Sequence, residues 1–189
     1  TKASPSTIAP ATPTLSFDGT PTPSAPATPS VSPSGKPTAS LPATSGAYPV
    51  TGLAAFASPS GRIWCATDGK AAWCHFPKGM TAKVPPSSSV CPGEDLDVTG
   101  VTVDGAEPGY FCSGDPTAFP RKGSDEVKWH DTLKLPYVSY DGFSLAVLPY
   151  GKSIIQGNYI CAVAEVGVTC GSIVTKHGFR MSVAGPEFF

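Results

Sequence analysis

Three histidines, six cysteines and a scatter of carboxylates are the residues of this chain that could do chemistry. A catalytic triad needs a histidine beside a nucleophile and an orienting carboxylate. His177 is the candidate base, with Ser172 and several aspartates elsewhere in the chain. No serine stands in the G-x-S-x-G pattern that exposes a nucleophile on a sharp turn. We therefore assign no catalytic residue and keep a hydrolase that uses His177, an aspartate and a serine as an alternative.

Paired carboxylates could instead hydrolyse a glycosidic bond. The weak candidates are Asp115 and Asp141, whereas the acidic residues between 94 and 97 are explained more simply as a solvated loop. Gly151-Lys152-Ser153 is similar to the end of a phosphate-binding loop, but Ala146 stands where that motif requires its first glycine. No residue pattern predicts a cofactor.

The cysteines are spaced like disulfide partners. Cys65 and Cys74 are nine residues apart, and so are Cys161 and Cys170. No C-x₂-C pair is present, so we expect no metal site. Six cysteines fit an oxidising compartment better than a cytosol.

Turn chemistry predicts how the first pair meets. If Cys65 lies opposite Cys74, the loop is Gly69-Lys70, and glycine in the first loop position suits a type II′ turn. The cysteines then form a non-hydrogen-bonded pair, within reach of a disulfide.

The second hairpin is expected to place Cys161 opposite Cys170. Glu165-Val166 is a poor two-residue turn, so we expect a longer loop that uses Gly167 at a positive φ, with the register left open. Cys91 and Cys112 are paired by elimination.

Residues 47–189 are expected to form one all-β domain, a disulfide-bridged antiparallel sandwich or small barrel of roughly seven to nine strands. Asp141-Gly142 predicts a hairpin between Tyr137 and Leu148, and Gly100 predicts a bulge. A short helix is expected over residues 124–130.

One strand face of the first hairpin is aromatic. Trp64 would face His75, with Trp73 diagonal to Trp64. These three residues are the candidate ligand-binding side chains, because tryptophan can stack on a sugar ring or anchor a partner protein. The alternative is that both tryptophans are core residues under a second layer.

Residues 1–46 have a different composition, with 10 Pro, 9 Thr, 9 Ser and 7 Ala. Such a segment buries too little apolar surface to offset its ordering entropy, which predicts a disordered tether with polyproline-II character. The net charge of −1 makes a nucleic-acid partner improbable. No apolar run is long enough for a transmembrane segment.

Several motifs resemble a domain of unknown function found in exported proteins and lipoproteins of actinobacteria. The resemblance runs from about Phe56 to Phe189 and is carried by residues 56–65, Trp73-Cys74, Cys112-Ser113-Gly114-Asp115, Leu148-Pro149-Tyr150-Gly151, Gly167-Val168-Thr169-Cys170 and His177-Gly178-Phe179. It implies export, a cell-envelope setting and a tether-plus-domain design, and it implies no catalytic residue.

Together these features predict an extracytoplasmic protein, either secreted or anchored to the cell envelope. We expect a non-catalytic domain on a flexible stalk that binds a partner protein or an envelope glycan. A secreted inhibitor or effector, presenting the loop between Cys91 and Cys112, is a further alternative.

Overall fold

The computed structural model describes residues 38–117 and 119–189. The chain divides into two units, Thr1–Lys36 and Pro37–Phe189, and every described residue belongs to the second. Residues 1–37 of the predicted tether lie outside the described residues. Residues 38–46, which were predicted to be part of the tether, belong to the second unit, and Ala39 is buried there. Among the described residues, no helix is long and apolar enough to cross a membrane.

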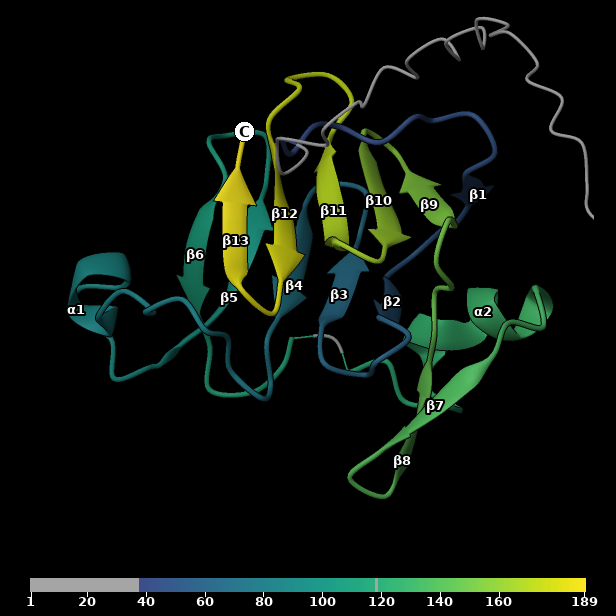
Figure 1. The fold of residues 1–189 in the computed structure, drawn as a ribbon, viewed down its shortest axis with the longest axis horizontal. Helices are drawn as coiled ribbons and strands as arrows, with labels where there is room; N and C mark the ends of the chain where they lie inside the picture. Colours follow the sequence, from purple (N-terminus) through teal and green to yellow (C-terminus); the bar gives the residue numbers. More distant parts are fainter. Residues whose placement is uncertain (1–37, 118) are drawn as a thin grey trace, which may run out of the picture. The chain divides into compact units, whose positions relative to one another are not determined.

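The larger sheet has six strands in the order β1-β9-β10-β11-β12-β13 (Figure 1). Its neighbouring strands are antiparallel except for β1 and β9, which run parallel. The strands are β1 (Tyr48–Pro49), β9 (Ser153–Gln156), β10 (Tyr159–Ala164), β11 (Gly167–Ser172), β12 (Gly178–Ser182) and β13 (Gly185–Phe188).

The second sheet has five antiparallel strands in sequence order, β2-β3-β4-β5-β6. They are β2 (Ala54–Ala57), β3 (Trp64–Thr67), β4 (Ala72–His75), β5 (Val98–Val103) and β6 (Gly109–Cys112). A separate hairpin projects below this sheet in Figure 1 and consists of β7 (Tyr137–Tyr140) and β8 (Phe143–Ala146). The helices are short: α1 (Ser87–Val90), the 3₁₀ helix η1 (Asp125–Val127) and α2 (Lys128–Thr132).

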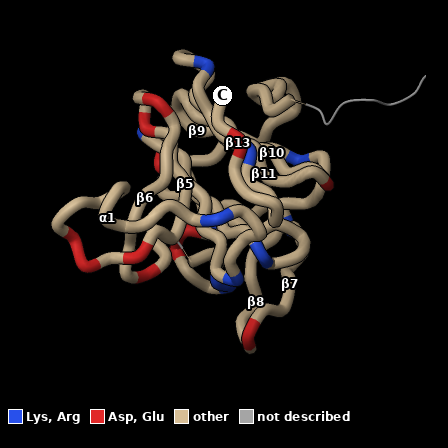
Figure 2. Tube along the Cα trace, turned by 60° about the vertical axis from the view of Figure 1, so that its left-hand side comes forward, with Lys and Arg blue, Asp and Glu red and all other residues tan. Residues whose placement is uncertain are grey.

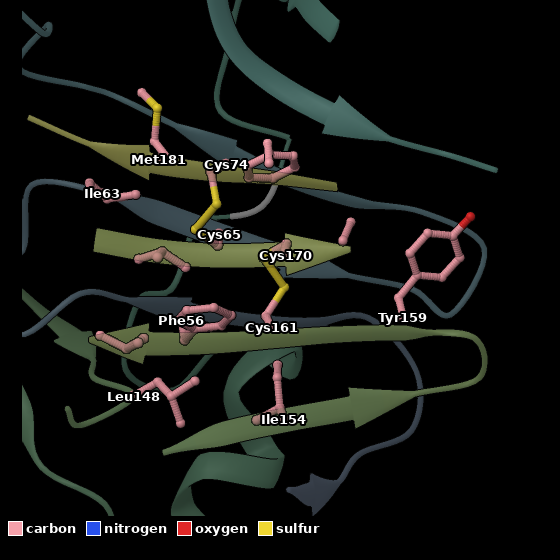
Figure 3. Close-up of a cluster of buried hydrophobic side chains, with 14 of the residues drawn as sticks. Phe56, Ile63, Cys65, Cys74, Leu148, Ile154, Tyr159, Cys161, Cys170 and Met181 are labelled. Carbon is pink, nitrogen blue, oxygen red and sulfur yellow. A yellow bond between two sulfur atoms is a disulfide. The ribbon is translucent and has the colours of Figure 1, made fainter. Parts of the chain in front are cut away.

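The two larger sheets pack face to face as a β-sandwich. Side chains alternate between the two faces of a strand, so every second residue enters the core. Phe56, Cys65 and Cys74 come from the five-stranded sheet, and Ile154 and Phe179 come from the six-stranded sheet. Figure 3 shows two disulfides among these buried side chains, one from each sheet. The fold class predicted from the sequence is confirmed, as a sandwich and not a barrel.

The disulfide pairing is also confirmed, as Cys65–Cys74, Cys91–Cys112 and Cys161–Cys170. Both hairpin disulfides join residues directly opposite each other, with Cα–Cα distances of 4.0 and 4.1 Å. These short distances agree with the predicted non-hydrogen-bonded pairs. In the first turn, the Asp68 carboxylate accepts hydrogen bonds from the amides of Lys70 and Ala71.

Two details of the sequence prediction were wrong, the loop length of the second hairpin and the number of strands, and a third was correct only in part. The second hairpin closes through the two-residue loop Glu165-Val166, because Ala164 pairs with Gly167 at φ +134°. The described residues form thirteen strands and not seven to nine, and most of these strands are only two to four residues long. The expected helix over 124–130 is a 3₁₀ turn followed by one α-turn, and no side chain caps its start.

Candidate ligand-binding face

The outer face of the five-stranded sheet carries the aromatic residues singled out in the sequence. Trp64 lies opposite His75, and Trp73 lies opposite Ala66. Because Cys65 and Cys74 point into the core, these neighbours point away from it. Trp73 is half-buried and packs against Ala55 and Ala66, whose small side chains leave room for the indole.

Gly100 allows an aromatic ring to lie across the middle of this sheet. It pairs with His75 on one side and Phe111 on the other, at the predicted bulge. A Cβ atom at Gly100 would lie 2.3 Å from Cε1 of Phe111. The Phe111 ring therefore occupies the space that a side chain would fill, and it meets the His75 ring edge-on at 5.1 Å.

Trp73 and Phe111 form part of the wall of a shallow pocket that we call the Trp73 groove. It is lined by Trp73, Thr102, Phe111 and Thr117 and has a volume of about 340 Å³. Its lining offers two aromatic rings and two hydroxyl groups, and no charged side chain. The indole Nε1 of Trp73 is buried and has no hydrogen-bond partner. Because this atom is inaccessible, a ligand in the groove would contact the indole ring and not its N–H group.

His75 holds the adjoining segment onto the sheet. Its Nε2 accepts a hydrogen bond from the amide of Thr117 at 3.1 Å and lies 3.0 Å from the Thr117 hydroxyl. Burial lowers the pKa of His75, and a hydrogen bond with the Thr99 backbone opposes that effect. His75 is 3% exposed. The ring is thus a neutral acceptor that positions Thr117, and the groove wall depends on it.

Trp64 occupies a neighbouring position on the same face. It is 6% exposed, and its Nε1 donates a hydrogen bond to the Gly61 carbonyl at 2.8 Å. Its ring contacts Phe119 at 4.8 Å and Tyr140 at 5.2 Å between centroids. Trp64, Asp115, Pro116 and Phe119 line a second pocket of about 380 Å³. Pro116 also lines a third pocket, of about 230 Å³, together with His75.

The fold therefore brings four sequence candidates, Trp64, Trp73, His75 and Asp115, onto one face around residues 115–117. The residues that the sequence analysis missed are Thr102, Phe111, Thr117 and Phe119. No sequence signal placed Phe111 on this face, because its position depends on the pairing of β6 with the bulged strand at Gly100.

Asp141 and His177 are placed differently. Asp141 is in the turn of the β7–β8 hairpin, where Lys78 pairs with it at 3.3 Å. His177 lies on the loop between β11 and β12 of the other sheet, with its Nε2 3.4 Å from the carboxylate of Glu107. The Ser172 hydroxyl accepts hydrogen bonds from the Val174 and Thr175 amides. In the described part of the chain, no hydrogen bond joins the His177 ring to a serine hydroxyl.

One group of potential metal ligands has a different explanation. The sulfur atoms of Cys65, Cys74 and Cys170 lie within 4.8 Å of one another. Each of them belongs to a disulfide. Because metal binding by cysteine requires the thiolate, this cluster of sulfurs is part of the core and has no ligand to offer.

Comparison with known proteins adds no relative to this description. No protein-family model, no curated protein and no solved structure matches the chain. The resemblance to the actinobacterial domain stays a prediction.

Proposed function

We propose that this chain is an exported, non-catalytic binding domain of the cell envelope and that its ligand is a glycan held in the Trp73 groove. Three disulfides support an oxidising, extracytoplasmic compartment. The Pro-, Ser- and Thr-rich composition of residues 1–46 supports a position on a stalk.

The observation that carries the proposal is the half-buried Trp73 in the centre of a sheet face. A sugar ring has apolar C–H faces and polar hydroxyl edges, so it needs an aromatic surface with donors and acceptors at its margin. Trp73 and Phe111 supply the rings, and Thr102 and Thr117 supply the hydroxyls. The groove volume of about 340 Å³ is within the range of small-molecule pockets and suits one or two sugar rings.

The absence of charge in the groove lining supports binding and not hydrolysis. Glycoside hydrolysis requires two carboxyl groups on either side of the scissile bond. None of the four lining residues carries one. His75 is a titratable residue on the same sheet face, and its Nε2 already accepts a hydrogen bond from the Thr117 amide.

The test is calorimetric titration of the full chain with three neutral tetrasaccharides: tetra-N-acetylchitotetraose, cellotetraose and mannotetraose. We expect at least one to bind, and Trp73→Ala to weaken that binding by about tenfold or more, because a central tryptophan dominates the binding free energy of such sites.

Tyr150→Ala is the matched control. Tyr150 is an aromatic residue with 50% exposure, and it lines none of the three pockets on this face. Its removal should leave binding unchanged. Equal loss in both variants, or binding that survives Trp73→Ala, would contradict the proposal.

A further inference from the structure

We infer that residues 121–124, here called the cationic loop, form a second subsite that takes an anionic group of the same ligand, which makes the ligand an acidic saccharide. This inference depends on the proposed function above for the rest of the ligand. The anionic group is a phosphate or carboxylate, and three features support it: a pocket, two cations without a salt bridge and a series of aromatic rings.

The pocket is small and polar. Arg121, Lys122, Gly123 and Ser124 line it, and its volume is about 190 Å³. The Ser124 hydroxyl is buried and has no hydrogen-bond partner. Arginine, lysine and an unsatisfied hydroxyl are all donors, so they suit the several acceptor oxygens of a phosphate or carboxylate group.

The two cations are available for such a group. The Arg121 guanidinium lies 5.4 Å from the centroid of the Phe143 ring, and the Lys122 ammonium lies 4.8 Å from that of Tyr137. Within residues 38–117 and 119–189, neither forms a salt bridge. The nearby Asp125 carboxylate is already paired with Lys128 at 2.8 Å.

The loop backbone is held in place before any ligand arrives. The Lys122 amide donates to the Ser144 carbonyl at 2.8 Å, and Arg121 forms an isolated bridge with Leu145 of β8. The Ser124 amide donates to the Arg121 carbonyl at 3.1 Å, with Gly123 at φ +87°. A loop that is already ordered loses less entropy when it binds.

Aromatic rings connect the cationic loop to the Trp73 groove. Thr117 lines the groove, and Pro116 and Trp64 line the next pocket. Trp64 contacts Phe119 at 4.8 Å, and Phe119 contacts Phe143 at 5.2 Å. The Arg121 guanidinium lies over Phe143, the last ring of this series. An extended saccharide can therefore contact the groove with one ring and the cationic loop with an acidic group further along.

The distribution of charged side chains over the domain agrees with an anionic ligand at the cationic loop. Figure 2 shows Asp and Glu along the loop beside α1, whereas Lys and Arg lie near the β7–β8 hairpin, with an acidic residue at its tip. Residues 121–128 carry three cationic and two acidic side chains. An anionic ligand would thus be attracted to the hairpin side of the face.

The experiment compares two matched probes on the full chain, tetragalacturonate and its neutral methyl ester. At low ionic strength we expect tetragalacturonate to bind about tenfold tighter. Arg121→Ala/Lys122→Ala should abolish this preference, and Lys83→Ala/Lys152→Ala should keep it. Lys152 is a fitting control because it also lies over a tyrosine ring, that of Tyr48. Equal affinity for both probes in the wild type, or a preference that survives the first variant, would overturn the inference.

A second readout separates this inference from the proposed function. Inorganic phosphate should shift the NMR amide signals of Gly123 and Ser124, and Ser124→Ala should weaken that shift while the fold stays stable. If phosphate shifts these signals and neither saccharide binds, the anion subsite is supported and the glycan proposal fails. If both saccharides bind equally, need Trp73, and phosphate shifts nothing, the groove is supported and the anion subsite is refuted.

Discussion

At the scale of single residues, the contacts of His75 decide which chemistry this face can perform. His75 stands between two tryptophans in the hairpin and would be a natural general base. Its Nε2 instead accepts the Thr117 amide, and its ring meets Phe111 edge-on. Since Nε2 must be unprotonated to accept this bond, the native state favours neutral His75.

This preference predicts a loss of stability in acid. The pKa of His75 is lowered by burial, and the same cause lowers the pKa of His130. Below the unfolded-state pKa of about 6.5 the unfolded chain binds protons that the native state does not, so the free energy of unfolding falls as pH decreases. Each histidine contributes a slope of at most about 1.4 kcal/mol per pH unit.

Urea denaturation between pH 8 and pH 5 measures this slope. His75→Gln keeps an acceptor for the Thr117 amide and cannot take up a proton, so the slope below pH 6.5 should decrease. His75→Gln/His130→Gln should be flatter still. A slope that is the same in His75→Gln as in the wild type would show that His75 takes up protons equally in the folded and the unfolded chain.

At the scale of elements, the groove depends on how β4, β5 and β6 fit together. Gly100 in β5 lies between His75 and Phe111, at a shift of strand register. The bulge at Gly100 was predicted from the change of alternation around it, because that signal is local. The position of the Phe111 ring over Gly100 could not be predicted, because it depends on which strand pairs with β5.

Gly100→Ala should therefore displace Phe111. The new Cβ would lie 2.3 Å from that ring and 2.6 Å from the Cys74 carbonyl oxygen. We expect a cost of about 1–3 kcal/mol in the free energy of unfolding, together with weaker saccharide binding. Chemical denaturation and calorimetry measure the two effects.

Gly109→Ala is the control, because it is in the neighbouring strand and a Cβ there would meet nothing within 4 Å. The proposed role of Gly100 would be refuted if Gly100→Ala bound ligand as the wild type does.

At the scale of the whole molecule, the two sheets also meet through their turns. Gly69 is in the turn between β3 and β4, and Gly157 is in the turn between β9 and β10. A Cβ at Gly157 would lie 2.8 Å from the Gly69 carbonyl oxygen, and Gln156 packs against Gly69 from the same turn. This contact joins the five-stranded sheet to the six-stranded sheet at one end of the sandwich.

Comparing two glycines isolates this contact. Gly157 has φ +54° and Gly142 has φ +81°, so alanine is strained at both, by about 1–2 kcal/mol. Of these two glycines, only Gly157 has another atom within 4 Å of the position that a Cβ would take. Gly157→Ala should thus lower the free energy of unfolding by about 1–3 kcal/mol more than Gly142→Ala does. If both variants lose the same free energy of unfolding in thermal or urea denaturation, the contact between the Gly157 and Gly69 turns does not stabilise the domain.

The sequence by itself determined the β class and the disulfide pairing, because the partners of each hairpin disulfide are close in the sequence and the third pair then follows by elimination. It also identified Trp64, Trp73 and His75 as one face. The tertiary structure alone decided that Phe111, Thr117 and Phe119 complete that face and that Arg121 and Lys122 lie at its end. These contacts join segments about 40 residues apart in the chain, such as His75 and Thr117. Their formation depends on the packing of the whole domain, and no local pattern specifies it.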